Sequence, residues 1–136
     1  MRKILISTCA ILMISVTANA CSGITIKGNS GTSYCLSKQT MNWYSAYAWC
    51  QAQGMKLIDL GPVCGRNSGT CSELSLSSDQ KTHITDNGGR VAWIWINKSI
   101  SSDRAFNVNL GSGALNQGSG YRNYSDYDIG YYALCF

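Results

Sequence analysis

The residues of this chain best suited to chemistry are its cysteines, and their spacing favours disulfide bonds over metal binding. The chain has 136 residues and seven cysteines, which are Cys9, Cys21, Cys35, Cys50, Cys64, Cys71 and Cys135. None of them forms a Cys-x-x-Cys pair, and His83 is the single histidine. Because structural zinc sites are built from such pairs and from histidines, we expect no metal site.

The other reactive side chains do not form a recognisable catalytic set. His83, the only candidate general base near neutral pH, lies in the polar segment "DQKTHITDNGG" and is expected at the surface. Glu73 is the only glutamate, so a glycosidase with paired carboxylates would have to recruit scattered aspartates. Gly-x-Ser-x-Gly and phosphate-loop motifs are absent from the sequence. We therefore expect no enzymatic activity and no cofactor.

The tyrosine-rich segment "YRNYSDYD" is the candidate binding site. Tyrosine offers a large contact area with few rotatable bonds, and Asn, Ser and Asp offer adaptable hydrogen bonds, as in antibody combining loops. We expect the ligand-binding residues to be Tyr121, Arg122, Asn123, Tyr124, Asp126, Tyr127 and Asp128, with Tyr131 and Tyr132 in structural roles. The alternative is an exposed polar loop without a ligand. In either case Asp126 and Asp128 are expected to be solvated and to bind no calcium.

The first 20 residues have the three parts of a secretory signal peptide. Arg2 and Lys3 form a charged end, residues 4–16 are mostly apolar, and Ala18-Asn19-Ala20 is a small-x-small cleavage site. The apolar run falls short of the roughly 20 residues that a membrane span requires, and no later stretch is long enough. We expect cleavage after Ala20, which leaves a single domain of residues 21–136 without a transmembrane segment. Lipidation of Cys21 is the alternative.

Removal of the signal peptide changes the number of cysteines and the net charge of the domain, and both bear on its location and partners. Removal of residues 1–20 takes Cys9 away and leaves six cysteines, an even number that favours disulfides in an oxidising compartment. The exported domain keeps nine basic and seven acidic residues, a net charge of +2 without clusters. Neither nucleic acid nor an anionic membrane is therefore an expected partner. We expect a location outside the cell or on its surface, with the periplasm as the alternative.

One main helix is expected at about residues 41–53. Thr40 or Asn42 is suited to cap its start, and Gly54 to end it in the left-handed conformation. One face of the helix is expected to be buried, and its members are Trp43, Ala46, Tyr47 and Cys50.

Strands are expected on both sides of this helix. An N-terminal hairpin turns at residues 28–31, and Met55–Leu60 leaves the helix as a short strand. In "RVAWIWIN" the tryptophans share one face and the isoleucines the other, so both faces are expected to be covered. In "AFNVNL" the alternation places Asn107 and Asn109 outward. The last strand is "GYYALCF".

Two long irregular regions, residues 61–89 and 118–128, separate these strands. The elements together predict an α+β fold with an N-terminal hairpin, one main helix and an antiparallel sheet with long loops.

The helix "NWYSAYAWCQAQGMKLIDL", the later "WIWI" strand and a terminal strand that closes on a cysteine resemble the C-type-lectin-like fold, and most closely its secreted bacterial branch. The resemblance covers nearly all of residues 32–136 and depends on the order and spacing of helix, strands and cysteines. It implies that the helix cysteine pairs with the last one, here Cys50 with Cys135. By proximity we pair Cys21 with Cys35 and Cys64 with Cys71, although six cysteines allow fifteen arrangements.

The calcium site of the sugar-binding C-type lectins does not carry over to this chain. Those proteins use a Glu-Pro-Asn or Gln-Pro-Asp triplet and a later Trp-Asn-Asp, because calcium takes several oxygen ligands. Here Pro62 is the only proline and lies outside such a triplet, and "INK" follows the tryptophans.

The resemblance therefore implies a secreted or cell-surface, adhesin-like recognition module. Its expected partner is a host or bacterial surface protein or glycan, bound without calcium through residues 97–104 and 118–128. The alternative is a structural subunit of a surface or pilus-like assembly, which would self-associate.

Overall fold

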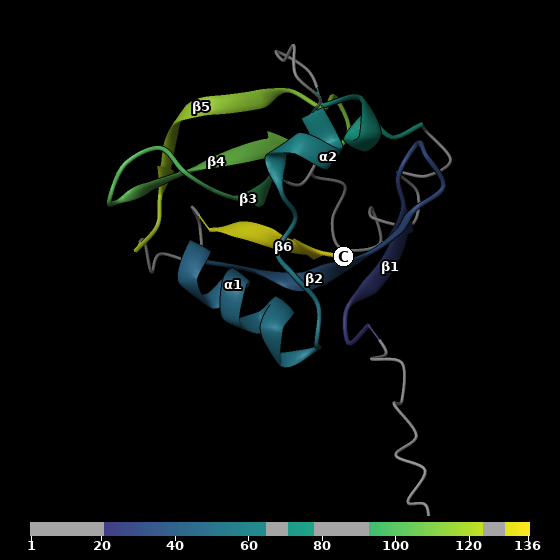
Figure 1. Ribbon diagram of the computed structural model, residues 1–136, viewed down its shortest axis with the longest axis horizontal. Coiled ribbons are helices and arrows are strands. Elements are labelled where there is room, and N and C mark those ends of the chain that lie inside the picture. Colours follow the sequence, from purple (N-terminus) through teal and green to yellow (C-terminus); the bar gives the residue numbers. More distant parts are fainter. Residues whose placement is uncertain (1–20, 65–70, 78–92, 124–129) are drawn as a thin grey trace, which may run out of the picture.

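The computed structural model describes residues 21–64, 71–77, 93–123 and 130–136, and Figure 1 shows their arrangement. The strands are β1 (Ile24–Lys27), β2 (Ser33–Met41), β3 (Trp93–Ser99), β4 (Arg104–Asn109), β5 (Leu115–Tyr121) and β6 (Tyr131–Cys135). The helices are α1 (Trp43–Ala52), α2 (Leu60–Cys64) and the short 3-10 helix η1 (Ser72–Leu74). The predicted α+β class and the N-terminal hairpin, β1 with β2, are confirmed.

The strands form one six-stranded sheet in the order β1-β2-β6-β3-β4-β5. β6 lies in its middle, antiparallel to β2 but parallel to β3. The prediction of an antiparallel sheet was wrong, because the sheet is mixed. β4 and β3 separate β5 from β6 in the sheet, so β5 and β6 are not joined as a hairpin, and a strand reached by a crossover can enter in parallel.

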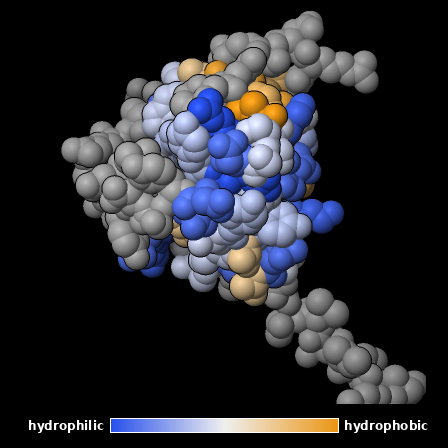
Figure 2. Space-filling view, turned by 90° about the vertical axis from the view of Figure 1, so that its left-hand side faces the viewer, coloured by the Kyte–Doolittle hydropathy of each residue, from blue (hydrophilic) through white to orange (hydrophobic). Residues whose placement is uncertain are grey.

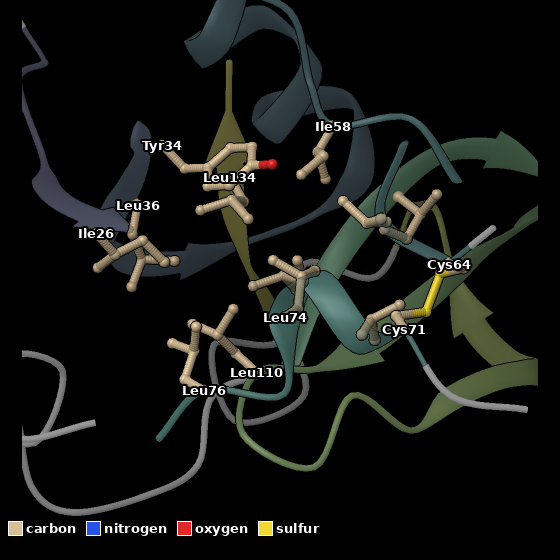
Figure 3. Packing of buried hydrophobic residues seen from close by; sticks show 14 residues of the cluster. Ile26, Tyr34, Leu36, Ile58, Cys64, Cys71, Leu74, Leu76, Leu110 and Leu134 are labelled. Atoms are coloured by element: carbon tan, nitrogen blue, oxygen red, sulfur yellow. A yellow bond between two sulfur atoms is a disulfide. The ribbon is translucent and has the colours of Figure 1, made fainter. Parts of the chain in front are cut away.

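Helices cover both faces of the sheet, which makes three layers (Figure 1). On one face α1 packs through Trp43, Ala46 and Cys50 against strand residues that include Trp95 and Ala133. On the other face α2 and η1 pack against the larger cluster in Figure 3, whose labelled members include Leu36, Leu74, Leu110 and Leu134. Trp95 and its neighbours Ile94 and Ile96 therefore belong to opposite clusters, and the predicted burial of both faces of this strand is confirmed.

α1 begins and ends where the sequence predicts, within two residues. The side chain of Asn42 caps the start by accepting a hydrogen bond from the Ser45 amide at 2.8 Å. Gly54, with φ 68°, lies just beyond the end, in a conformation that costs other residues more. The prediction that Tyr47 is buried was wrong, because its side chain is 37% exposed. Its ring stacks on Trp43 at the margin of the buried face instead of packing on the sheet.

Two tryptophans hold the start of α1, and the end of β2 just before it, against β3 by hydrogen bonds. Trp43 Nε1 on the helix donates to the Ile96 carbonyl of β3 at 2.9 Å. Trp95 Nε1 on β3 donates to the Met41 carbonyl, just before the helix, at 2.8 Å. Each buried indole N–H thus has a carbonyl partner, and a shift of α1 along the sheet would break the Trp43 bond.

Three disulfides join Cys21 to Cys35, Cys50 to Cys135, and Cys64 to Cys71, and these are the predicted pairs. The bond from α1 to β6 holds Cα atoms 5.5 Å apart across a sequence separation of 85 residues. In the chain-entropy model a loop of this length is worth about 4 to 5 kcal/mol. The central strand is therefore covalently fixed to the helix that covers it.

Residues Met55–Leu60 do not form the predicted strand. Only Leu57 makes a bridge, to Cys135, and Leu60 already begins α2. The segment is nevertheless held by its backbone: Lys56 exchanges two hydrogen bonds with Phe136, and the amide of Ile58 donates to the Leu134 carbonyl. Its path beside the end of β6 is too short for a continuous ladder, since α2 turns the chain away.

The predicted irregular regions are partly regular where the structure describes them. α2 and η1 interrupt residues 61–89, and β5 extends to Tyr121, so residues 118–121 are strand and not loop. At η1 the carboxylate of Glu73 accepts hydrogen bonds from the Ser30 amide and hydroxyl and from the Tyr34 hydroxyl. Burial and this carboxylate together raise the pKa of Tyr34. The only glutamate of the chain thus fastens the hairpin tip to η1.

Asn107 does not face outward, as its place in "AFNVNL" predicted, because its side chain is fully buried. It lies opposite Trp95 on β3 and close to Gly120 on β5, where an added Cβ would stand 2.9 Å from Asn107 Nδ2. Neither Nδ2 nor Oδ1 has a hydrogen-bond partner in the part of the chain that the structure describes. The prediction from the alternation was wrong because β4 is covered on both faces, so the face that carries Asn107 is buried as well.

A bulge in β2 is stabilised by one hydroxyl group. The pairing of β2 with β6 shifts register between Leu36 and Thr40. In this interval the buried Ser37 Oγ accepts a hydrogen bond from the Ala133 amide at 2.9 Å and donates one to the Gln39 carbonyl at 2.8 Å. The hydroxyl group thus takes the place of the backbone acceptor that the bulge removes from the Ala133 amide.

We predict that Ser37→Ala lowers the free energy of unfolding by about 1 to 3 kcal/mol, because the buried Ala133 amide loses its acceptor. Urea unfolding of the oxidised protein, followed by tryptophan fluorescence, measures this change. Ser33→Ala, at an exposed position of the same strand, is the control and should change stability by less than about 0.5 kcal/mol. Equal effects of the two variants would contradict the role given to Ser37.

We predict that Asn107→Val raises the free energy of unfolding by about 1 kcal/mol, because it removes two unsatisfied buried polar atoms and adds a strand-forming side chain. The matched control is Asn109→Val in the same strand, where Asn109 Oδ1 accepts hydrogen bonds from the Ser112 amide and hydroxyl. That variant should be destabilised. Thermal unfolding of both distinguishes the signs, and a destabilised Asn107→Val protein would show that the Asn107 amide is needed.

Candidate functional site

The end of β5, the start of α1 and the turn between β3 and β4 meet on one side of the molecule, at the left in Figure 1. Of the predicted ligand-binding residues, Tyr121, Arg122 and Asn123 lie here. Tyr124, Asp126, Tyr127 and Asp128 lie outside the described residues. Three of the seven can therefore be placed, and they follow one another on the chain.

Tyr121 is held by its neighbour across the sheet. It is the last residue of β5, is 45% exposed, and pairs in register with Arg104 of β4. Arg104 Nη2 donates a hydrogen bond to the Tyr121 hydroxyl at 2.6 Å, and the guanidinium carbon lies 4.6 Å from the ring centroid. A cation over the ring face is attracted by its quadrupole, so this exposed phenol is held in one position.

Arg122 joins the three converging segments. Its amide donates to the Asp103 carbonyl at 2.6 Å, and its own carbonyl accepts from the Trp43 amide at 3.2 Å. Its guanidinium carbon lies 4.0 Å from the Trp43 ring centroid and 4.9 Å from that of Tyr44, and Nη1 donates to the Ser102 carbonyl. Its Nε is buried, and no described residue accepts from it. Arg122 is thus a fixed cation between two aromatic rings.

The aromatic rings of α1 complete this surface. Trp43 contacts Tyr44 edge-on, with centroids 5.3 Å apart, and stacks with Tyr47 at 5.6 Å and an interplanar angle of 21°. Tyr44 is 45% exposed. We call Tyr44, Arg104, Tyr121 and Arg122, with Trp43 as their buried base, the aromatic–arginine surface.

The turn between β3 and β4, predicted as the second binding loop, borders this surface. Its backbone closes through hydrogen bonds from the Ile100 and Ser101 amides to the Arg104 carbonyl. The Ser101 hydroxyl donates to the Asp103 carboxylate at 2.6 Å and thereby lowers the pKa of Asp103. The two loops expected to share a ligand, residues 97–104 and 118–128, therefore meet at Arg122.

Figure 2 views this side of the molecule. Its visible coloured surface is mostly blue and pale, with the strongest orange near its upper edge, beside atoms drawn in grey, and a smaller pale-orange area near its lower edge. A stable obligate interface would require a broad apolar area. The mixture of rings, cations and hydroxyl groups is instead suited to a polar, specific contact.

The other side chains that the sequence offers for chemistry are placed only in part by the described ranges. These ranges contain no group of three or more His, Cys, Asp or Glu residues that could hold a metal ion. All six described cysteines are in disulfides, and His83 lies outside the described residues. No helix among the described residues is both long and apolar enough to cross a membrane.

The sequence indicated Tyr121 and Arg122, but not the contacts of Arg122 with α1 or the pairing of Tyr121 with Arg104 on β4. Tyr44 was not singled out, and Trp43 was assigned only to the buried face of the helix. The sequence carries only a local signal for these contacts, which is the spacing of Tyr44 and Tyr47 three residues apart on the helix beside Trp43. In the structure both tyrosine rings are exposed. Their contact with residues near position 122 has no local signal.

No protein-family model matches this chain, and no curated protein matches it either. Its function is therefore argued from the geometry of its own residues.

We predict that Arg122→Ala lowers the free energy of unfolding by about 1 to 2 kcal/mol, because the half-buried side chain loses two aromatic contacts and one hydrogen bond. Lys98→Ala is the control, since the exposed Lys98 lies 5.5 Å from the Phe106 ring and should matter less. Chemical denaturation measures both. An Arg122→Ala protein as stable as the Lys98→Ala protein would mean that Arg122 does not join the segments.

Proposed function

We propose that this protein is a secreted or cell-surface recognition module of C-type-lectin-like fold, which binds a protein or glycan without calcium. The observation that carries the proposal is the fixed position of Arg122 over Trp43 and Tyr44, beside the exposed Tyr121. Large, rigid aromatic side chains beside fixed cations supply binding energy with little entropy left to lose. The tyrosine-rich residues 124–128 continue directly from this surface in the chain.

The framework supports a recognition role because it fixes the surface before any ligand arrives. The start of α1 is held by two tryptophan hydrogen bonds and its end by the Cys50–Cys135 disulfide. A surface ordered in advance binds with a smaller entropic cost than a flexible one. Disulfides of this kind are typical of exported proteins, which supports a location outside the cytoplasm.

The C-type-lectin-like assignment is supported by the arrangement of the helix and the last strand. A helix that ends in glycine, a disulfide from it to a central terminal strand, and a Trp-Ile-Trp-Ile strand beside that strand fit the resemblance. The calcium triplet of the sugar-binding members is absent from the sequence. Recognition through aromatic and arginine side chains is therefore the mode that these residues favour.

A structural subunit of a surface assembly is the second candidate. It is favoured by one observation: β1 and β5 are edge strands of an open sheet. Unpaired strand edges are templates for pairing with another chain. Light scattering over a range of protein concentrations tests this alternative, which requires self-association.

We predict that the exported, oxidised protein binds ligands on glycan or host-protein arrays equally well with calcium and with a chelator. A variant with Tyr121, Tyr124 and Tyr127 replaced by alanine should lose this binding, because the ring contacts are gone. Phe136→Ala removes an exposed ring outside the aromatic–arginine surface and should bind normally.

Binding that disappears in chelator would refute the calcium-free mode. No binding on any array, together with concentration-dependent self-association, would contradict the proposed recognition role and favour the structural role.

A further inference from the structure

A groove of about 550 Å³ lies beside the C-terminal half of α1 and does not include the aromatic–arginine surface. It is lined by Tyr47 and Gln51 of α1, by residues 54–57, and by Asp59 and Asn97. Its volume is in the range of small-ligand sites. It is large enough for one long side chain of a partner together with its backbone.

The walls of the groove are fixed by backbone hydrogen bonds. Gly54 turns the chain back at the end of α1, and the amides of Gly54 and Met55 donate to the last carbonyls of the helix. The amide of Ile58 bonds to the Leu134 carbonyl on one side, and its carbonyl accepts from the Asn97 amide on the other. The groove is therefore preformed, because neither wall can move without breaking main-chain bonds.

Asp59 is the distinctive group of the groove. It is half-buried, and Asn97 Nδ2 donates to its Oδ1 at 3.2 Å. Asn97 is its only hydrogen-bond partner among the described residues, and no described lysine or arginine forms an ion pair with it. The other two described acidic residues are engaged, Glu73 by the hairpin tip and Asp103 by Ser101. A partly desolvated carboxylate with only a neutral amide as partner gains most from an added cation.

Tyr47 supplies a ring for such a cation. It is 37% exposed and is backed by Trp43, on whose ring it stacks. Elsewhere in the molecule two arginines lie over aromatic rings, Arg104 over Tyr121 and Arg122 over both Trp43 and Tyr44. A guanidinium is planar, is weakly hydrated and presents five donors, so it can stack on a ring and bond to carboxylate and amide oxygens together.

We infer that this groove binds an arginine side chain of a partner protein, with Asp59 and Asn97 as acceptors and Tyr47 as the stacking ring. Lys56, exposed at the same groove, is the one opposing charge among its lining residues. The inference goes beyond the recognition surface proposed above, because it uses a separate set of side chains and either site can fail alone. A neutral sugar is the competing occupant, and its binding would depend little on either charge.

The test uses the full oxidised protein and the blocked pentapeptide Gly-Gly-Arg-Gly-Gly. The control peptide carries citrulline, which has the shape of arginine without its charge. Amide NMR titration should show saturable shifts at Gln51, Asn97 and their neighbours with the arginine peptide, and binding that weakens as salt is added. The citrulline peptide should bind at least about fivefold more weakly.

Removal of the charge at Asp59 and at Lys56 should change the affinity for the arginine peptide in opposite directions. Asp59→Asn should weaken binding at least about fivefold, whereas Lys56→Gln should strengthen it about twofold, because the opposing charge is removed. Tyr47→Ala should weaken binding, and Tyr44→Ala, three residues earlier on the same helix but outside the groove, should not. Tyr121→Ala should leave the peptide titration unchanged, which separates this site from the aromatic–arginine surface. Thermal unfolding of each variant shows that it is folded.

Several results would overturn the inference. These are no saturable binding, equal binding of the arginine and citrulline peptides, weaker binding by Lys56→Gln, or loss of binding only in Tyr121→Ala. Salt-independent shifts of the same amides with maltose, in place of the arginine peptide, would assign the groove to a neutral sugar instead.

Discussion

The attachment of α1 to the sheet is the constraint on which the rest of this structure depends. The Cys50–Cys135 disulfide fixes one end of the helix to the central strand. The Trp43 bond to β3 fixes the other end, and the Trp95 bond holds the chain at Met41, just before the helix. The aromatic–arginine surface lies at the tryptophan end, and the groove with Asp59 lies toward the disulfide end. A helix that shifted by one turn would displace both, so the two candidate binding regions share a single fixed support.

Local features of the fold were predictable, whereas long-range ones were not. Asn42 and Gly54 mark the ends of α1 in the sequence, and the hairpin turn at residues 28–31 has its own residue signature. The parallel pairing of β6 with β3 has no such signature, because it depends on a crossover between distant segments. The alternation around Asn107 gives correct strand faces but cannot tell that a second layer covers the polar one.

In the candidate sites, too, local features were predictable from the sequence and long-range contacts were not. Tyrosine and polar composition identified Tyr121 and Arg122 within one short segment. The contacts of Arg122 with Trp43 and Tyr44 join positions separated by most of the domain, and the Asp59–Asn97 pair spans 38 residues. Composition can indicate which residues bind, but only the fold determines which distant residues stand beside them.

The central place of β6 also has a consequence for the order in which the disulfides form. β6 follows the other five described strands in the chain, so Cys135, the native partner of Cys50, is synthesised after the other described cysteines. Cys35 of β2 lies directly opposite Cys135 in the sheet and is therefore the natural competitor for it. The bridge from Cys21 to Cys35 spans only 14 residues and can close long before Cys135 arrives. Closure of this short bridge occupies Cys35 and leaves Cys50 as the partner of Cys135.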